Sequence, residues 1–275
     1  MKMRVNSKYA WVIIMAVITL QYAFSGGGRD NSQASSYTIE VGGSTSVTPL
    51  MEMFAEEYAK VKPSIKININ GTGSGDGITN AGVTYQIGMS SRELTPAEQG
   101  RGLREEVIAI DGIAIIVNSS NPVSNLSIEQ IRSIYTGGIT NWSQVGGNSA
   151  PIAVISREAG SGTRGAFEEI IGFAGRLVAG ANESTSTGAI KAGVMQNPNA
   201  IGYISLGSMD NTIKALSADN VTASSANVVN GTYKVARPFI VLTGKNVHAE
   251  TAAFVQWMLG SAGQAVVSRS WIPVN

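Results

Sequence analysis

Arg157-Glu158-Ala159-Gly160-Ser161-Gly162-Thr163 joins an apolar run, Ile152 to Ser156, to a helical pattern that continues to Ile171. A strand, a glycine-rich turn and a helix in this order are typical of α/β proteins with parallel sheets. The first turn of such a helix has four backbone N–H groups without an internal partner, at the positive end of the helix dipole. Glycine allows close backbone approach, hydroxyl groups can donate hydrogen bonds, and Arg157 adds a full charge. The stretch therefore predicts a binding site for a small anion.

Two further stretches repeat this pattern between an apolar run and a helical run, namely Gly43-Ser44-Thr45-Ser46 and Gly71-Thr72-Gly73-Ser74-Gly75-Asp76-Gly77. Any one of the three could be an ordinary cap or turn, because caps and turns use the same residue types. Three such junctions in one chain exceed what capping requires. Ligands of open α/β sheets bind at the carboxyl ends of strands, and we therefore expect the three loops to converge on one anion.

Apolar periodicity predicts the remaining elements. The last helix is expected to begin beside His248, with Trp257 in its buried face, and Trp142 is expected to anchor a loop. Strands are expected at 37–41, 64–70, 85–90, 107–110, 112–118, 152–156, 201–204 and 235–243. Helices are expected at 47–61, from 78 onward, from 95 onward, at 127–135, 160–171, 186–196 and 249–268. The alternation of strands and helices implies α/β lobes with largely parallel sheets.

Composition excludes several kinds of function. The chain has 275 residues, a net charge of +1 and 14% charged residues, which provides no electrostatic field for nucleic acid. It has no cysteine and a single histidine, so thiolate metal sites and cysteine nucleophiles are excluded and a histidine-based zinc site lacks ligands. We expect no metal, no cofactor and no catalytic residue.

The N-terminal residues have the three-part pattern of a secretory signal. Lys2, Arg4 and Lys8 precede an apolar run at 10–24, and small residues follow it. Residues 1–25 are therefore expected to be a signal peptide or an uncleaved N-terminal anchor, and residues 26–36 a flexible linker. Both alternatives place the rest of the chain outside the cytoplasm, in the periplasm or on the outer face of the membrane.

The glycine-rich loop at 71–77 does not match the nucleotide-binding motifs. Gly71, Gly73 and Gly75 begin a dinucleotide pattern, but Asp76 stands where its last Gly or Ala is required. A phosphate-binding loop of the Walker type is absent as well, because no Gly-Lys-Ser/Thr follows these glycines.

The chain resembles the phosphate-binding proteins of phosphate ABC transporters, within the type 2 periplasmic binding-protein superfamily, over most of 37–275. The resemblance is carried by Gly43-Ser44-Thr45-Ser46-Val47, Gly73-Ser74-Gly75-Asp76-Gly77-Ile78, Gly88-Met89-Ser90-Ser91-Arg92, Asp111-Gly112-Ile113-Ala114, Asn141-Trp142, Arg157-Glu158-Ala159-Gly160-Ser161-Gly162-Thr163 and Ile201-Gly202-Tyr203-Ile204. It implies a two-lobed α/β fold, each lobe a mostly parallel sheet flanked by helices. Residues 37–111 and 237–275 are expected to form lobe 1 and residues 112–236 lobe 2, with the ligand in the cleft between them.

The same resemblance implies an exported, monomeric solute-binding protein that captures inorganic phosphate and delivers it to a membrane permease without chemical change. The residues it implies as phosphate ligands are Thr45, Ser46, Ser74, Ser91, Arg157, Ser161, Gly162 and Thr163. Better-known members have an aspartate where this chain has Ser91, and that aspartate accepts the proton of hydrogen phosphate.

The serine at position 91 leaves several alternatives open. Its hydroxyl oxygen can accept one hydrogen bond, or Asp76, Asp111 or Glu158 could supply a carboxylate. Arg92 either reinforces the site or forms a structural ion pair. Another oxyanion, such as sulfate, molybdate or tungstate, is the alternative ligand, and phosphate sensing at the cell surface is the alternative role.

Overall fold

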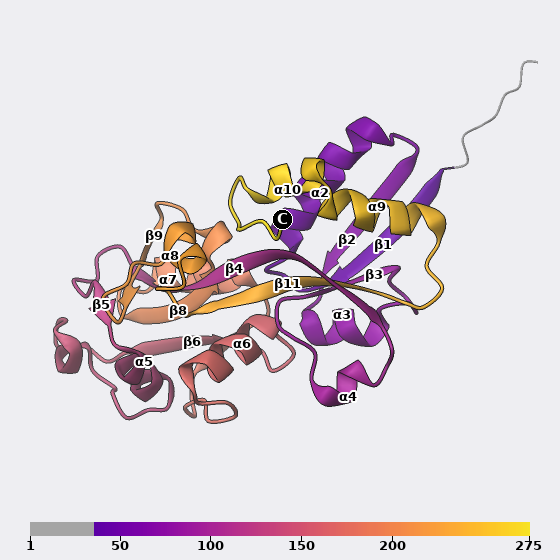
Figure 1. The fold of residues 1–275 in the computed structure, drawn as a ribbon. Helices are drawn as coiled ribbons and strands as arrows, with labels where there is room; N and C mark the ends of the chain where they lie inside the picture. The colour runs from indigo at the N-terminus through magenta and orange to yellow at the C-terminus, as the bar shows by residue number, and fades with distance from the viewer. Residues whose placement is uncertain (1–35) are drawn as a thin grey trace, which may run out of the picture. The chain divides into compact units, whose positions relative to one another are not determined.

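The computed structural model describes residues 36–275 (Figure 1). The predicted signal segment 1–25 and all but the last residue of the predicted linker lie outside these residues. The strands are β1 (Tyr37–Gly43), β2 (Ile65–Gly71), β3 (Ile87–Ser90), β4 (Arg104–Asn118), β5 (Asn125–Leu126), β6 (Ala153–Arg157), β7 (Asn182–Ser184), β8 (Ala200–Ser205), β9 (Ile213–Ala215), β10 (Ser217–Ala218) and β11 (Ala236–Thr243). The helices are α2 (Thr48–Val61), α3 (Ser74–Asn80), α4 (Pro96–Gln99), α5 (Ile128–Tyr135), α6 (Gly162–Ile171), α7 (Thr187–Gln196), α8 (Ser225–Val229), α9 (Ala249–Leu259) and α10 (Ser261–Val267), with 3₁₀ turns η1 (Trp142–Val145) and η2 (Leu206–Ser208).

Within residues 36–275, nine strands form one sheet in the order β2-β1-β3-β11-β4-β8-β6-β7, and β9 pairs with β4. The fold is α/β, as expected. Toward the two ends of the sheet the strands pair in parallel. At one end β1 lies between β2 and β3, and at the other β6 lies between β7 and β8. At the centre, β11 is antiparallel to β3 and β4, and β4 is antiparallel to β8. The sheet is therefore mixed rather than mostly parallel, because β4 and β11 run in opposite directions through its middle (Figure 1).

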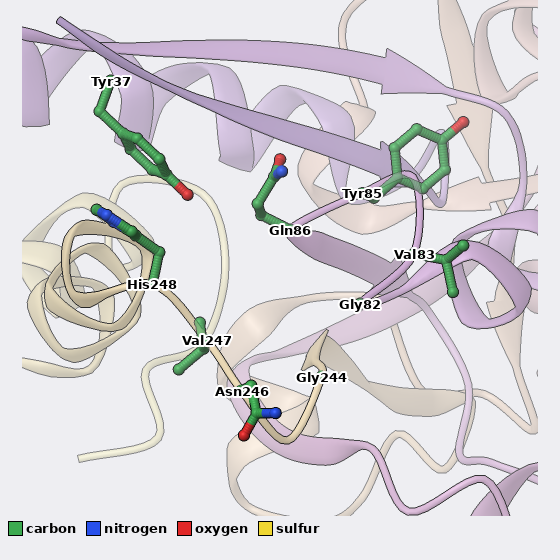
Figure 2. A pocket seen from close by; sticks show the side chains of 9 residues that line it. All are labelled: Tyr37, Gly82, Val83, Tyr85, Gln86, Gly244, Asn246, Val247 and His248. Atoms are coloured by element: carbon green, nitrogen blue, oxygen red, sulfur yellow. The ribbon is translucent and has the colours of Figure 1, made fainter.

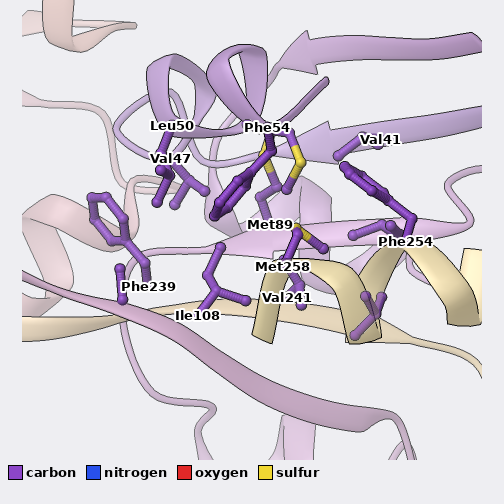
Figure 3. Packing of buried hydrophobic residues seen from close by; sticks show 14 of the residues in the cluster. Val41, Val47, Leu50, Phe54, Met89, Ile108, Phe239, Val241, Phe254 and Met258 are labelled. Carbon is purple, nitrogen blue, oxygen red and sulfur yellow. The ribbon is translucent and has the colours of Figure 1, made fainter. Parts of the chain in front are cut away.

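The two largest of the four hydrophobic clusters in residues 36–275 lie along this sheet and are called the first and the second core. The first core takes its buried residues from 39–109 and 239–271, with helices α2, α9 and α10 packed together on one side (Figure 1). Figure 3 shows Leu50 and Phe54 of α2, Met89 of β3, and Phe254 and Met258 of α9 gathered in one cluster. The second core takes its buried residues from 113–235. Strands β4 and β11 connect the two.

The second core is organised around aromatic residues. Tyr203 stacks on Phe167 with ring centroids 4.1 Å apart, and Tyr135 packs edge-on against Phe167 at 5.0 Å. Trp142 is buried and its indole N–H donates to the carbonyl of Asn199 over 2.9 Å. The prediction that Trp142 anchors a loop is confirmed.

Three predicted elements differ from those observed. The two expected strands at 107–118 form one fifteen-residue strand, β4, because the chain stays extended as it passes between the cores. The expected helix at 249–268 is two helices, since Gly260 is extended (φ −77°, ψ 171°) and α10 folds back on α2. A Cβ at Gly263 would lie 2.4 Å from the carbonyl oxygen of Met258, so this close return requires glycine. The helix expected from 78 begins earlier, at Ser74.

His248 takes the role expected of it. It is the N-cap of α9, and its Nδ1 accepts a hydrogen bond from the backbone N–H of Glu250 at 3.3 Å. Trp257 is half-buried and packs beside Phe54 and Tyr58. Among the helices of residues 36–275, none combines the length and the apolar character that crossing a bilayer demands.

Candidate functional site

The predicted loops all follow the carboxyl ends of strands. Residues 44–47 follow β1, residues 72–73 separate β2 from α3, and residues 158–161 separate β6 from α6. A fourth segment, beginning at Ser91, follows β3. Glycine positions bring these segments together, since a Cβ at Gly77 would lie 2.6 Å from the carbonyl oxygen of Met89 and 2.8 Å from the Cα of Gly43. Close backbone contact thereby fixes the start of α3 against β1 and β3.

Hydroxyl groups from these loops meet in one buried cluster. Ser46 Oγ lies 2.7 Å from Thr163 Oγ1, and Ser91 Oγ lies 3.5 Å from the same atom. Ser74 Oγ lies 3.3 Å from Ser91 Oγ and accepts the backbone N–H of Ser91 at 3.1 Å. A fifth hydroxyl, that of Thr187, lies 3.0 Å from Ser46 Oγ. These five residues, Ser46, Ser74, Ser91, Thr163 and Thr187, are called the hydroxyl cluster.

The loop before α6 contributes backbone groups as well as side chains. The Ser161 hydroxyl is the N-cap of α6 and accepts the N–H of Arg164 at 3.3 Å. A Cβ at Gly162 would lie 2.3 Å from Ser74 Oγ and 2.9 Å from Ser91 Oγ. Glycine is therefore required at 162 for the hydroxyl cluster to exist. The backbone of Gly160 also accepts the N–H of Gly75 at 3.0 Å, which joins the α6 loop directly to α3.

Arg157 is 2% exposed, and its guanidinium donates to five oxygen atoms of four residues. Its Nε and Nη2 donate to the two carboxylate oxygens of Glu158, each over 2.8 Å. The same two nitrogens also donate to backbone carbonyls, Nε to Ser184 at 3.2 Å and Nη2 to Thr185 at 3.4 Å. Its Nη1 approaches Thr187 Oγ1 at 3.5 Å, at the edge of the hydroxyl cluster. The guanidinium is thus oriented in advance, with one of its nitrogens directed to the cluster.

Tyr203 fixes the backbone of Arg157. Its hydroxyl accepts the N–H of Arg157 at 3.1 Å and lies 2.8 Å from Ser156 Oγ. Burial among the aromatic residues raises the pKa of Tyr203 to about 12. The group therefore stays a neutral donor and acceptor across the physiological range.

A buried ion pair lies behind Ser91 and was not found by sequence reasoning. Arg237 donates from Nη1 to the carbonyl of Ser91 at 3.2 Å and from Nη2 to Asp111 Oδ2 at 3.0 Å. Asp111 also accepts from the hydroxyl of Ser205 at 2.8 Å. Burial raises the pKa of Asp111, and the Arg237 charge opposes that rise. The sequence separation of 126 residues left no local signal for this pair.

The three carboxylates considered as substitutes for an aspartate at 91 all have other hydrogen-bond partners. Asp76 accepts from Thr72, Asn80 and Tyr85 at 2.6, 2.7 and 2.9 Å. Asp111 and Glu158 pair with the two arginines just described. Arg92 forms an ion pair with Glu98 at 2.7 Å, which favours the structural alternative for that arginine.

All eight predicted site residues lie in or beside the hydroxyl cluster. Ser46, Ser74, Ser91 and Thr163 belong to it, Gly162 and Arg157 adjoin it, and Thr45 and Ser161 flank it, with Thr45 Oγ1 3.4 Å from Thr187 Oγ1. Thr187 was missed. Its signal is the stretch Ser184-Thr185-Ser186-Thr187-Gly188, a fourth run of hydroxyl residues and glycine before a helix.

A separate pocket of about 210 Å³ lies at the other end of β1 (Figure 2). Figure 2 shows Tyr37 and His248 face to face, and their rings stack at 4.0 Å. This pocket shares no lining residue with the hydroxyl cluster. In residues 36–275 there is also no group of three or more His, Cys, Asp or Glu side chains arranged to hold a metal. The hydroxyl cluster and the groups beside it offer O–H, N–H and guanidinium donors, which are groups that can form hydrogen bonds to an anion.

Comparisons with known proteins agree with this chemistry. A family model described as a PBP superfamily domain matches residues 29–262. A solved structure from Clostridium perfringens, provisionally described as a phosphate ABC transporter substrate-binding protein with bound phosphate, is 45% identical, and the match covers 86% of this chain and 100% of that one with a TM-score of 0.85. An ABC-type phosphate transport receptor from Vibrio cholerae is 38% identical, covering 85% of this chain and 99% of its own, with a TM-score of 0.71. The phosphate-binding protein PstS of Borreliella burgdorferi is 26% identical over 93% of this chain and 95% of its own length.

Proposed function

The chain belongs to the PBP superfamily and, within it, to the phosphate-binding proteins of ABC transporters, and from this membership we propose that it binds inorganic phosphate at the hydroxyl cluster. The proposed ligands are Thr45, Ser46, Ser74, Ser91, Arg157, Ser161, Gly162 and Thr163. The observation that carries the proposal is the meeting of Ser46 and Thr163, 117 residues apart in the chain, beside a buried guanidinium. Such a set of donors matches the oxygens of a tetrahedral anion.

The strength of binding follows from the number of donors. Each hydrogen bond to a charged group contributes about 1.5–3 kcal/mol net. Association and ordering of the loops oppose this gain. Several such bonds together support micromolar or tighter binding. Because Arg157 is already oriented by Glu158 and two carbonyls, little of the gain is lost in arranging it.

We further propose that two lobes close on the ligand, lobe 1 from residues 37–111 and 237–275 and lobe 2 from residues 112–236. The two hydrophobic cores support this division, since one takes its buried residues from 39–109 and 239–271 and the other from 113–235. Strands β4 and β11 would act as the hinge. Buried residues of β4 belong to both cores, and β11 runs from directly after Val235 of the second core to Phe239 and Val241 of the first. The hydrogen bond from Gly75 to Gly160 would then form on closure.

Hydrogen phosphate carries a proton that fully ionised sulfate lacks, so the group that accepts this proton decides how well the site distinguishes the two anions. The three nearby carboxylates are engaged with other donors, so the proposed acceptor of that proton is the hydroxyl oxygen of Ser91. A hydroxyl accepts less strongly than a carboxylate and does not repel a fully ionised anion. This arrangement therefore favours weaker rejection of sulfate than an aspartate at 91 would give, and it keeps another oxyanion as the second candidate.

The proposed role is delivery of phosphate, unchanged, to a membrane permease. The family consists of substrate-binding transport proteins, which supports binding without catalysis. We propose export by residues 1–25, a position outside the cytoplasm and a monomeric state, with release on contact with the permease. Residues 26–36 would then separate the binding domain from the membrane if the N-terminal segment is retained.

Calorimetric titration of the full chain, freed of bound ligand by reversible unfolding, tests the proposal. We expect phosphate to bind at micromolar concentration or below, with sulfate weaker. Equal or tighter sulfate binding would replace phosphate with another oxyanion as ligand. Absence of binding by phosphate, sulfate, molybdate and tungstate would overturn the function proposed for the hydroxyl cluster.

A further inference from the structure

Thr187 lies at the meeting point of elements that are far apart in the sequence. It is the first residue of the ten-residue helix α7, and the hydroxyl of Ser186 caps that helix by accepting the N–H of Ala189 at 3.1 Å. The side chain of Thr187 is therefore not needed as the cap. It is 7% exposed and turned away from solvent into the hydroxyl cluster.

The hydroxyl of Thr187 contacts the loop after β1, a strand of the first core, and the end of β6, a strand of the second core. Oγ1 lies 3.0 Å from Ser46 Oγ and 3.4 Å from Thr45 Oγ1, both in the loop after β1. It lies 3.5 Å from Nη1 of Arg157 at the end of β6. A guanidinium can only donate, so Thr187 Oγ1 accepts from Arg157 and directs its own hydrogen toward the first loop.

The backbone N–H of Thr187 is also directed toward the loop after β1. This N–H, in the first turn of α7, lies 3.4 Å from Thr45 Oγ1, which is a long and weak hydrogen bond. N–H groups in a first helical turn have no partner within the helix and carry the positive end of its dipole. Thr187 thus brings an O–H and an N–H donor to the same side of the site as the charge of Arg157.

We propose that Thr187 is a further phosphate ligand, supplied by a fourth loop, which binds an oxygen of the anion together with Arg157. This inference rests on the phosphate-binding function proposed above. Thr187 binds across the division between the cores, so it holds the site closed as well as contributing affinity. Its loss is expected to act mainly on the dissociation rate of phosphate.

The test compares Thr187→Val, which removes the hydroxyl while keeping the shape of the side chain, with Thr187→Ser, which retains the hydroxyl. Thr222→Val is the matched control, since Thr222 is exposed and lies outside the hydroxyl cluster. Phosphate dissociation constants and dissociation rates are measured for the full chain, and thermal unfolding without phosphate checks each fold.

Thr187→Val is expected to weaken phosphate binding about tenfold to hundredfold, mostly through faster dissociation. Thr187→Ser is expected to remain within about threefold of the unchanged protein, by the same hydroxyl argument. The inference is overturned if Thr187→Val binds as Thr222→Val does, or if Thr187→Ser is as weak as Thr187→Val with an intact fold. Failure of the unchanged protein to bind phosphate would instead overturn the function proposed for the whole site, and so the two failures are distinguishable.

Discussion

Asp111 and Arg237 are paired across the two antiparallel strands that join the first core to the second. They are register partners on β4 and β11, their charged groups are 3.0 Å apart, and each side chain is 1% exposed. The same guanidinium donates to the carbonyl of Ser91. The pair therefore holds β4 against β11. It also fixes the position of Ser91, a member of the hydroxyl cluster.

Removing one member of this pair should be strongly destabilising. Asp111→Asn leaves the Arg237 charge buried without its counterion, and we expect a loss of about 3–5 kcal/mol in the free energy of unfolding. The double variant Asp111→Leu with Arg237→Met should recover most of that loss, because neither charge remains to be desolvated. Urea unfolding measures both. A single variant within about 1 kcal/mol of the unchanged protein would contradict the burial argument.

Arg157 should contribute more to affinity than to stability. Arg157→Met removes the charge and the planar fork, and phosphate binding should weaken by at least about a hundredfold. This change also leaves the Glu158 carboxylate without its partner, and an unpaired carboxylate repels an anion. The double variant Arg157→Met with Glu158→Gln removes that repulsion, so its phosphate affinity reports the loss of attraction by Arg157 alone. The exposed Arg269→Met is the control for a general loss of positive charge. Titration calorimetry gives the affinities, and unchanged binding would remove Arg157 from the site.

Gly162→Ala should block the site without harming the helix. The added Cβ would lie 2.3 Å from Ser74 Oγ, whereas alanine is the better helix former by roughly 1 kcal/mol. We expect the thermal stability of the ligand-free protein to be kept and phosphate binding to fall severely. Gly165→Ala in the same helix is the control, since its Cβ would meet only the flexible side chain of Arg92 at 3.2 Å. Equal binding by the two variants would argue against a ligand position beside Gly162.

The ion pair between Arg92 and Glu98 should appear in the acid stability of the protein. The hydrogen bond from Arg92 lowers the pKa of Glu98 from its ordinary 4.5 to about 2. A carboxyl with a lowered pKa stabilises the fold above the unfolded value, and that stability is lost as the pH falls from about 4.5 toward 2. Glu98→Gln should therefore show a shallower decline of unfolding free energy over this interval. Glu93→Gln is the control, and a decline as steep in Glu98→Gln as in Glu93→Gln would refute the assignment.

Much of the candidate site could be predicted from sequence because its parts are local. Each loop carries glycine and hydroxyl residues directly before a helix, and Ser161 as the cap of α6 shows that such patterns report helix starts. The same local reasoning missed Thr187, whose stretch of hydroxyl residues looks like an ordinary cap. It also missed Arg237, which stands in an apolar strand and shows its role only beside Asp111 and Ser91.

The sequence by itself determined the α/β class, most of the element boundaries and the anion chemistry of the loops, because periodicity, caps and glycine act over a few neighbouring residues. Tertiary structure alone decided that β4 and β11 cross the sheet antiparallel, which makes the sheet mixed. It also decided that Ser46 meets Thr163 and Thr187, more than a hundred residues away, and that three buried or half-buried carboxylates are engaged with other donors. These outcomes depend on which strand lies beside which, and that order follows from packing both cores together rather than from any local pattern.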